Sequence, residues 1–408
     1  MISVDEARSL ILRNAAPGPI ESLPLLQSLG RVLAESIVAP LALPPFDNSA
    51  MDGFAVRARD LEGAGPSAPV RLPIVMEVAA GFTASSPLEP GTACRIMTGS
   101  PIPLGADAVV MVEQTQEDAG TVVFARPAAP GQNIRLAGED LMLGDRLLEA
   151  GTVLTPARIA LLAGIGRADV RVHAAPRVAI LTTGDELVQP GTPLQPGQIY
   201  DSNAYAMAAM VAETGAIPFI LGVIKDDREQ TRRLLEEAAT YDVIVTSGGV
   251  SMGVYDFVGE TLSQHGTMHF DRVAQQPGKP FTYATLWGKP VFALPGNPVS
   301  TMVCFEVYVR PALRRIMGQA DGDRLRVWAT MQEPFSKKPG RQAFLRAVIE
   351  RTPEGDLARL AGAQGSAILS SMARANALLI VPAETTHLAE GERVEALTLT
   401  SFHQERTC

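Results

Sequence analysis

Glycines and carboxylates follow four apolar segments in the middle of the chain. The groups are Gly184, Asp185 and Glu186 after VAILTT, Asp226 and Asp227 after PFILGVI, Gly248, Gly249 and Ser251 after DVIVTS, and Gly296, Asn297 and Pro298 after PVFALP. We interpret the segments as strands of a parallel sheet, in which ligands bind beyond the carboxyl ends of the strands. These loops are therefore the first candidates for a binding site.

Two of these loops resemble anion-binding turns. The SGGVS loop has small residues that let backbone N–H groups approach a phosphate, although a tight strand-to-helix connection explains the same glycines. In PGNPVS, Asn297 can cap a helix that Pro298 begins, Ser300 adds a hydroxyl donor, and free N–H groups at the helix start favour an anion. A well-capped helix without a ligand fits that spacing equally well.

The carboxylates Asp185, Glu186, Asp226, Asp227 and Asp256 would repel one another if they gathered at one sheet edge. A cation would offset that repulsion. Mg2+ usually takes one or two carboxylates, keeps several waters and completes its shell with substrate phosphates, which suits acidic residues beside phosphate-binding loops. For any single carboxylate, a solvated position at a helix start is the simpler interpretation.

Two further segments carry charged side chains in restrained turns. In QQPGKP, Lys279 stands between prolines, so its ammonium group could hold an oxyanion, although a surface lysine is commoner. In PPFDNSAMDGFAV, Asp47 and Asp52 lie in a turn before an apolar strand. Asn48 and Gly53 make an ordinary polar turn a sufficient explanation there.

Composition limits the classes of protein that fit. The chain has 408 residues, a net charge of −9 and 46% hydrophobic residues, which predicts several soluble domains rather than an electrostatic nucleic-acid binder. No apolar stretch reaches the roughly 18 residues of a membrane span, and acidic Asp5 and Glu6 argue against a signal peptide, so we expect a cytoplasmic protein. Cys94, Cys304 and Cys408 are too widely spaced for a disulfide framework or a CxxC metal site.

Periodicity predicts the elements that position these residues. An amphipathic helix opens the chain, short β-like runs follow from Phe54 to Arg126, and TPARIALLAG forms a second helix that could pack with the first. From Arg177, apolar runs alternate with helices expected at 204–214, 228–240, 255–264 and 298–317, which is typical of a parallel α/β sheet. The tail returns to short strands, RVWATM, QAFLRAVI, ALLIVP and RVEALTL, which suit a compact barrel or sandwich.

The motifs together resemble one family. PPFDNSAMDGFAV, RIMTGSPIPLGADAVVMVE, GEDL, GTVLTPARIALLAGIG, TTGDEL, GQIYDSN, SGGVSMGVYDF, PGKPF and LPGNPVS occur in this order and span nearly the whole chain. The set is similar to the MoeA family of molybdopterin molybdenumtransferases and to the E domain of gephyrin. That resemblance implies molybdenum cofactor biosynthesis, in which molybdenum from molybdate enters adenylylated molybdopterin with Mg2+-dependent release of AMP.

The resemblance also implies an architecture, which agrees with the periodicity. It consists of a mixed helical N-terminal and linker domain (1–46 and 138–176), an inserted small β domain (47–137), a doubly wound α/β molybdopterin-binding domain (177–322) and a C-terminal β-barrel-like domain (323–408). Family members are elongated homodimers in which the β domain of one subunit covers the α/β pocket of the other. Transient contact with other cofactor assembly proteins would fit the same pathway, and no nucleic acid or membrane partner is expected.

Residue by residue, the resemblance assigns roles to positions of this chain. Asp52, Thr98 and Asp140 fall on the partner side of the cleft. The expected catalytic residues are Asp52, Asp140, Glu186, Asp226, Asp256 and Lys279, with Glu186, Asp226 and Asp256 as Mg2+ ligands. The expected substrate-binding residues are Thr98, Thr183, Gly184, Ser247, Gly248, Gly249, Ser251, Pro295, Gly296, Asn297 and Ser300, and those expected to bind molybdate are Lys279, Ser300, Arg346 and Ser366.

One departure from the family pattern lies just before PGKP. Many members carry lysines where this chain has Arg272 and Gln276, so one positive charge is missing, although glutamine can still donate a hydrogen bond. The resemblance implies a reaction that needs no protein nucleophile, because the dithiolene sulfurs of the pterin would ligate the metal. Two alternatives stay open: a relative that hydrolyses or forms the adenylate without inserting metal, and a gephyrin-like dimeric scaffold.

Overall fold

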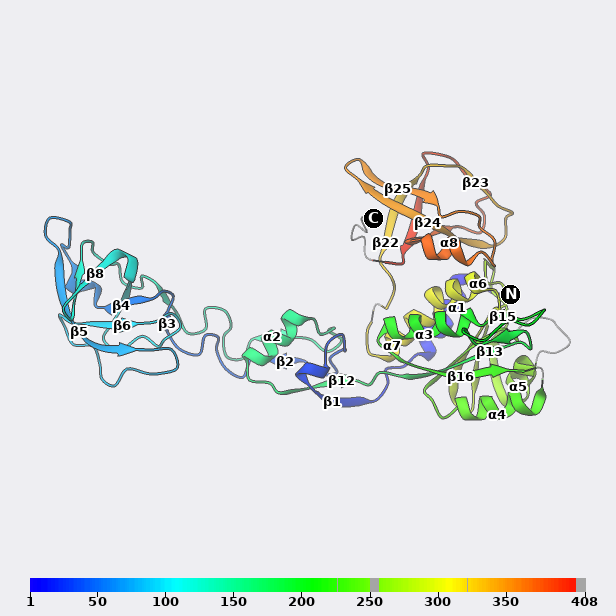
Figure 1. The fold of residues 1–408 in the computed structure, drawn as a ribbon, viewed down its shortest axis with the longest axis horizontal. Helices are drawn as coiled ribbons and strands as arrows, with labels where there is room; N and C mark the ends of the chain where they lie inside the picture. The colour runs from blue at the N-terminus through cyan, green and yellow to red at the C-terminus, as the bar shows by residue number, and fades with distance from the viewer. Residues whose placement is uncertain (226, 250–256, 321, 401–408) are drawn as a thin grey trace.

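The computed structural model describes residues 1–225, 227–249, 257–320 and 322–400. The molecule is elongated (Figure 1), with a small β domain at one end and the α/β and C-terminal domains together at the other. A narrow middle region joins them, built from the pairs β1 (Ile20–Pro24) with β12 (Asp169–His173) and β2 (Ile37–Val38) with β11 (Arg146–Leu148). The multidomain architecture of α/β and β units expected from the sequence is confirmed.

The central sheet of the α/β domain has the strand order β16-β13-β17-β21-β20-β18. Its parallel strands are β13 (Arg177–Thr183), β16 (Ile217–Ile224), β17 (Val243–Ser247) and β21 (Lys289–Leu294), and they coincide with the predicted apolar runs. Two antiparallel strands, β18 (Gly266–Phe270) and β20 (Thr282–Leu286), extend the sheet and were not predicted. The parallel strands place their carboxyl ends, and hence the candidate loops, at one edge.

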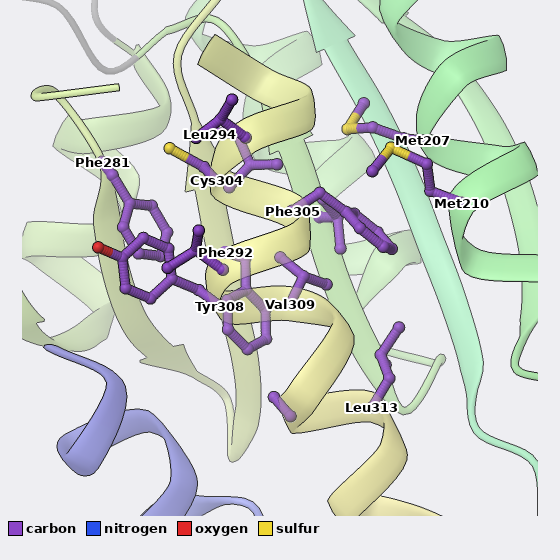
Figure 2. Close-up of a cluster of buried hydrophobic side chains, with 14 of the residues drawn as sticks. Met207, Met210, Phe281, Phe292, Leu294, Cys304, Phe305, Tyr308, Val309 and Leu313 are labelled. Carbon is purple, nitrogen blue, oxygen red and sulfur yellow. The ribbon is translucent and has the colours of Figure 1, made fainter. Parts of the chain in front are cut away.

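Helices cover both faces of this sheet, as a doubly wound fold requires. They are α3 (Ser202–Thr214), α4 (Arg228–Ala238), α5 (Phe257–His265), and the continuous run of α6 (Pro298–Cys304), the π-helical turn η4 (Phe305–Val309) and α7 (Arg310–Ile316). One core contains Met207, Phe292 and Phe305 from α3, the sheet and η4, and Figure 2 shows these side chains packed together. The opposite core contains Leu235 and Leu262 from α4 and α5.

Hydrogen bonds attach the first helix, α1 (Val4–Asn14), to the continuous run of α6, η4 and α7 near Pro311. Pro311 has no N–H group, so the carbonyl of Val307 four residues earlier has no α-helical donor. Arg8 Nη1 donates to that carbonyl at 2.5 Å, and Arg8 Nη2 pairs with Asp323 at 2.6 Å. These bonds tie the start of the chain to the α/β domain.

The packing of α1 differs from the expectation that it pairs with the second helix. Its buried residues Val4, Ala7 and Ile11 belong to the core of the α/β domain. Helix α2 (Pro156–Gly164) instead packs on the 3-10 turn η1 (Leu25–Gln27) in the small core of the middle region. We therefore propose one change to the predicted division, namely that α1 belongs with the α/β domain.

The inserted β domain contains a sheet with the order β7-β4-β6-β5-β9-β8. Its strands are β4 (Gly53–Val56), β5 (Val70–Val78), β6 (Ala93–Ile96), β7 (Ala108–Met111), β8 (Thr115–Asp118) and β9 (Thr121–Phe124), and β3 (Asn48–Ser49) pairs with β10 (Ile134–Arg135) nearby. The 3-10 turns η2 (Ala58–Leu61) and η3 (Val112–Gln114) connect strands. Cys94 is buried in this domain, and burial raises the pKa of its thiol to about 11, in keeping with a structural cysteine.

The C-terminal domain is a closed five-stranded barrel. Its strands are β22 (Arg326–Met331), β24 (Gln342–Thr352), β25 (Gly355–Leu360), β26 (Ala377–Val381) and β28 (Arg393–Thr398), and the pairing of β24 with β26 closes the sheet. Helix α8 (Leu369–Arg374) and the pair β23 (Phe335–Ser336) with β27 (His387–Leu388) flank it. A short strand, β19 (Gln275–Gln276), pairs in parallel with β24 and so joins the α/β domain to the barrel. Across the described ranges, no helix has the length and apolarity that crossing a membrane requires.

Candidate functional site: a cationic cleft and a sheet edge

A cleft of about 380 Å³ lies where the α/β domain meets the barrel. Lys279 and Ser300 of the α/β domain and Arg346 and Ser366 of the barrel all line it, so the structure brings together every residue expected to bind molybdate. Gln276, Asn297 and Arg341 line it as well, and its described lining contains no carboxylate. The cleft is therefore suited to an anion rather than to a metal cation.

Gln275, which is fully buried, anchors the loop that carries Lys279. The Gln275 Nε2 atom donates to the Pro277 carbonyl at 2.9 Å and to Cys304 Sγ at 3.3 Å, and the Tyr308 hydroxyl donates to Gln275 Oε1. Gly278 has φ +98°, and a Cβ atom there would lie 2.5 Å from Cys304 Sγ. Only glycine fits this turn without strain, and the exposed Lys279 projects from a fixed base.

Arg346 provides a buried positive charge on the barrel side. Its side chain is 1% exposed, and its Nε atom donates to Ser371 Oγ at 3.2 Å. The Nη2 atom donates to the carbonyls of Ala363 at 3.2 Å and Gly365 at 3.0 Å. Burial lowers the pKa of the guanidinium, which nevertheless stays charged, and no carboxylate among the described residues pairs with it. A bound anion would compensate this charge.

The start of α6 supplies hydroxyl and amide groups to the same cleft. Asn297 occupies the N-cap position, but its side chain does not cap the helix as the sequence suggested. Its Nδ2 atom instead donates across the domain boundary to Ser366 Oγ at 3.1 Å, and the Val299 N–H donates to the Ser366 carbonyl at 3.1 Å. Ser300 is 3% exposed, and its hydroxyl makes no hydrogen bond to another described residue. That hydroxyl is available to a ligand.

The glycine-rich loops meet at the carboxyl edge of the sheet. A Cβ atom on Gly248 would lie 2.4 Å from Thr183 Oγ1, and one on Gly296 would lie 3.6 Å from the Cα atom of Gly248. Gly249 has φ +65°, a conformation that favours glycine. The expected substrate-binding loops after β13, β17 and β21 are thus adjacent, with glycines that leave their backbone open to a ligand.

A hydrogen-bond network beneath these loops was missed by the sequence reasoning. Asn203 Nδ2 donates to Ser247 Oγ at 2.8 Å and to the Gly296 carbonyl at 2.7 Å. Ser247 Oγ donates to the Pro295 carbonyl at 3.1 Å, which also accepts from Thr301 Oγ1 at 2.6 Å. Asn203 stands in the GQIYDSN motif, but its spacing alone gives no contact to strands so distant in the sequence. The two hydrogen bonds of Asn203 connect the loop after β17 to the loop after β21.

Of the acidic residues expected near the sheet edge, the structure describes Asp185, Glu186 and Asp227. Glu186 is exposed, and its carboxylate folds back over Gly184, where a Cβ atom would lie 2.5 Å from Oε2. Lys225 Nζ supports this loop by donating to the carbonyls of Gly184 at 3.3 Å and Asp185 at 3.1 Å. Asp227 caps α4 by accepting from the Gln230 N–H at 2.6 Å, which is the simpler role considered for it.

Of the three expected Mg2+ ligands, the structure describes only Glu186. Asp226, Ser251 and Asp256 lie outside the described residues, and within the described ranges no group of three or more His, Cys, Asp or Glu residues could hold a metal. Mg2+ needs only one or two carboxylates when phosphates complete its shell. An exposed Glu186 beside the glycine-rich loops has the right oxygen chemistry for such a shared site.

The residues expected on the partner side of the cleft lie in the inserted β domain or directly after it. The Thr98 N–H and hydroxyl donate to Asp52 Oδ1 at 2.6 and 2.8 Å, and these bonds lower the pKa of the Asp52 carboxyl. Asp140 is exposed in the segment that leaves the β domain. Strands β4 and β6, which adjoin Asp52 and Thr98 in the sequence, lie at the opposite end of the molecule from the α/β domain (Figure 1), so within one chain these two residues do not reach its loops.

Comparison with known families accounts for almost the whole chain. Residues 2–166 match the MoeA N-terminal region (domain I and II), residues 179–315 match a probable molybdopterin binding domain, and residues 329–399 match the MoeA C-terminal region (domain IV). A molybdopterin molybdenumtransferase 2 from Mycobacterium tuberculosis is 41% identical, and the match covers 98% of this chain and all of the relative. The chain belongs to the MoeA family.

Other MoeA relatives give the same result. A molybdopterin molybdenumtransferase from Haemophilus influenzae is 36% identical, over 97% of this chain and 98% of the relative. The crystal structure of a molybdopterin biosynthesis MoeA protein from Pyrococcus horikoshii superposes with a TM-score of 0.85 at 34% identity, over 98% of this chain and all of that one. The similarity therefore covers every domain, including those that form the cationic cleft.

Proposed function

We propose that this chain is a molybdopterin molybdenumtransferase that moves molybdenum from molybdate into adenylylated molybdopterin and releases AMP. The names of its full-length relatives support this assignment. The observation that carries it is the cationic cleft, where Lys279, Ser300, Arg346 and Ser366 face one space without a carboxylate in the described lining. Neither a scaffold nor a simple adenylate hydrolase needs such a cleft beside a nucleotide-binding edge.

Molybdate is a tetrahedral dianion, and the cleft offers it both charge and hydrogen-bond donors. Lys279 and Arg346 supply positive charges from opposite domains. Ser300 supplies a buried hydroxyl, and the hydroxyl of Ser366 already accepts a hydrogen bond from Asn297, which leaves its own proton free to point at an oxyanion. Hydrogen bonds to a charged oxyanion are roughly twice as strong as those between neutral groups, which favours an anion in this cleft.

The carboxyl edge of the central sheet, with the glycine-rich loops after β13, β17 and β21, is the proposed site of the pterin nucleotide. Backbone groups of Gly248, Gly249 and Gly296 would approach the ligand closely, and Thr183 offers a hydroxyl at the end of its strand. Ser247 would act indirectly, because its buried hydroxyl already bonds to Asn203 and Pro295 and so holds the loops in place. Pro295 and Gly184 shape the same loops, and Ser251 is expected to contribute from outside the described residues. These residues bind and orient the substrate and hold its phosphates away from bulk water.

Mg2+ is the proposed cofactor, with Glu186, Asp226 and Asp256 as its protein ligands. When bound, Mg2+ supplies charge neutralisation and Lewis acidity at the phosphates whose cleavage releases AMP. Lys225 holds the Glu186 loop through its backbone carbonyls, so it fixes the direction from which that carboxylate approaches. The dithiolene sulfurs provide the ligands for molybdenum, and the protein contributes alignment and electrostatics rather than a nucleophile.

A homodimer would complete the site. Asp52, Thr98 and Asp140 would then be contributed by the partner subunit, since they cannot reach the loops of their own α/β domain. Support comes from apolar side chains exposed around these residues, including Met51 and Met142, which a partner surface would cover. We also propose a cytoplasmic location.

The test is production of molybdenum-bearing cofactor from adenylylated molybdopterin, molybdate and Mg2+. We expect the unaltered chain to insert molybdenum and release AMP, and Lys279→Ala and Glu186→Ala to lose most of this activity. Lys289→Ala, on the far side of the same domain, serves as the control for loss of a lysine. AMP release without metal insertion by the unaltered chain would instead support the hydrolase alternative.

A further inference from the structure

The cationic cleft contains a third positive side chain that neither the sequence motifs nor the family resemblance singled out. Arg341 lines the cleft together with Lys279 and Arg346. It is half-buried, and its guanidinium forms no hydrogen bond or ion pair with any other described residue. An arginine that faces an anion-binding cleft with all its donors free is chemically equipped to bind the anion.

The backbone of Arg341 is held firmly in place. Its carbonyl accepts a hydrogen bond from Lys337 Nζ at 3.0 Å. The next residue, Gln342, opens strand β24, and its N–H donates to the Ala274 carbonyl at 2.9 Å. The cationic side chain therefore extends from an anchored position instead of a free loop.

The same strand pairing brings Arg341 beside Gln276. In the parallel register of β19 and β24, Gln275 lies opposite Gln342 and Gln276 lies opposite Ala343. Arg341 comes directly before β24, two residues ahead of Ala343, so its backbone lies at the end of this strand pairing next to the Gln275–Gln276 segment. Both residues line the cleft. Arg341 is thus well placed to supply the charge that a lysine at position 276 would provide.

We propose that Arg341 is a third anion-binding residue of the cleft and that it replaces the positive charge that Gln276 lacks. This proposal rests on the proposed function, because it assumes that molybdate occupies the cleft. Arg341 is more exposed than Arg346, so water screens its interaction with the anion. An exposed charge pair contributes little, but the anion carries two charges, so we expect removal of Arg341 to weaken molybdate binding about threefold to tenfold.

The experiment is calorimetric titration of the full-length protein with sodium molybdate. Arg341→Gln should raise the dissociation constant, and the double variant Arg341→Gln with Gln276→Lys should recover most of the lost affinity. Arg359→Gln removes an exposed arginine of the same barrel that lies outside the cleft, and it should bind like the unaltered protein. The difference between Arg341→Gln and the unaltered protein should shrink as salt is added.

Several outcomes would overturn the proposal, and they differ from one another. Equal molybdate affinity in Arg341→Gln and Arg359→Gln would show that Arg341 is only a solvated rim residue. An unchanged molybdate constant with a raised KM for adenylylated molybdopterin would assign Arg341 to the nucleotide. Loss of affinity that Gln276→Lys does not restore would remove the claim of charge replacement. If the unaltered protein does not bind molybdate, the proposed function fails first.

Discussion

Gly278 is the residue whose replacement tests the construction of the cleft most sharply. Its φ of +98° is unfavourable for a residue with a Cβ atom, and that atom would lie 2.5 Å from both Cys304 Sγ and Gln275 Nε2. A strained backbone costs about 1–3 kcal/mol, and overpacking of a core costs a further 1–3 kcal/mol or so. Gly278→Ala should therefore destabilise the α/β domain by roughly 2–6 kcal/mol.

A matched control separates the two contributions. Gly288 has a similar φ of +79° in the same domain, but nothing lies within 4 Å of a Cβ atom built there. Gly288→Ala should show the backbone cost alone, so its loss of stability should be clearly smaller than that of Gly278→Ala. Cys304→Ala introduced into Gly278→Ala should recover part of the difference, because it removes one of the two crowding atoms.

The assay is scanning calorimetry of the full-length chain combined with molybdate titration. At about 2–4 °C per kcal/mol for a domain of this size, Gly278→Ala should lower the transition midpoint of the α/β domain by roughly 4–24 °C. Molybdate affinity should also fall, since the loop that directs Lys279 is displaced. Equal midpoint shifts for Gly278→Ala and Gly288→Ala would refute the argument that contact with Cys304 and Gln275 dictates glycine.

Three other predictions follow from buried groups. Ser371→Ala should raise the KM for molybdate about tenfold with little change in the KM for the pterin, because Arg346 loses the acceptor of its Nε–H group. A matching rise in both KM values would indicate general damage to the protein instead. Glu306→Gln should destabilise the fold by about 2 kcal/mol in denaturant titrations, because it removes a buried charge shared by Arg310 and Arg324 while Glu213 still pairs with both. An unchanged midpoint would contradict this. Cys94 should resist iodoacetamide at pH 8 until the protein unfolds, because a pKa of about 11 keeps its thiol protonated, and rapid labelling of the native protein would disprove that.

Local patterns in the sequence were sufficient to predict the four parallel strands of the central sheet. Buried parallel strands read as continuous apolar runs, and VAILTT and DVIVTS became β13 and β17 as expected. The strands β18 and β20 were missed because GTMHF and TYATL are short and mix polar with apolar residues. Short strands such as these are specified by their neighbours in the sheet more than by their own composition.

Interactions between distant segments explain what the sequence could not predict. The amphipathic pattern of α1 indicates that one face is buried, but it cannot identify the partner, which proved to be the α/β core. Asn297 was expected to cap a helix by local rules, yet its side chain bonds to Ser366, 69 residues away. Arg346 and Ser371 lie in separate elements of the barrel, so only the fold reveals that one orients the other.

The most direct measurement of the central claim is a crystal structure of the protein soaked in molybdate, with anomalous diffraction recorded at the molybdenum edge. The account predicts an anomalous peak in the cleft between the α/β domain and the barrel, within hydrogen-bonding distance of Lys279, Ser300, Arg346 and Ser366, and loss of that peak in Lys279→Ala. A molybdenum peak elsewhere on the protein, with this cleft empty, would contradict it.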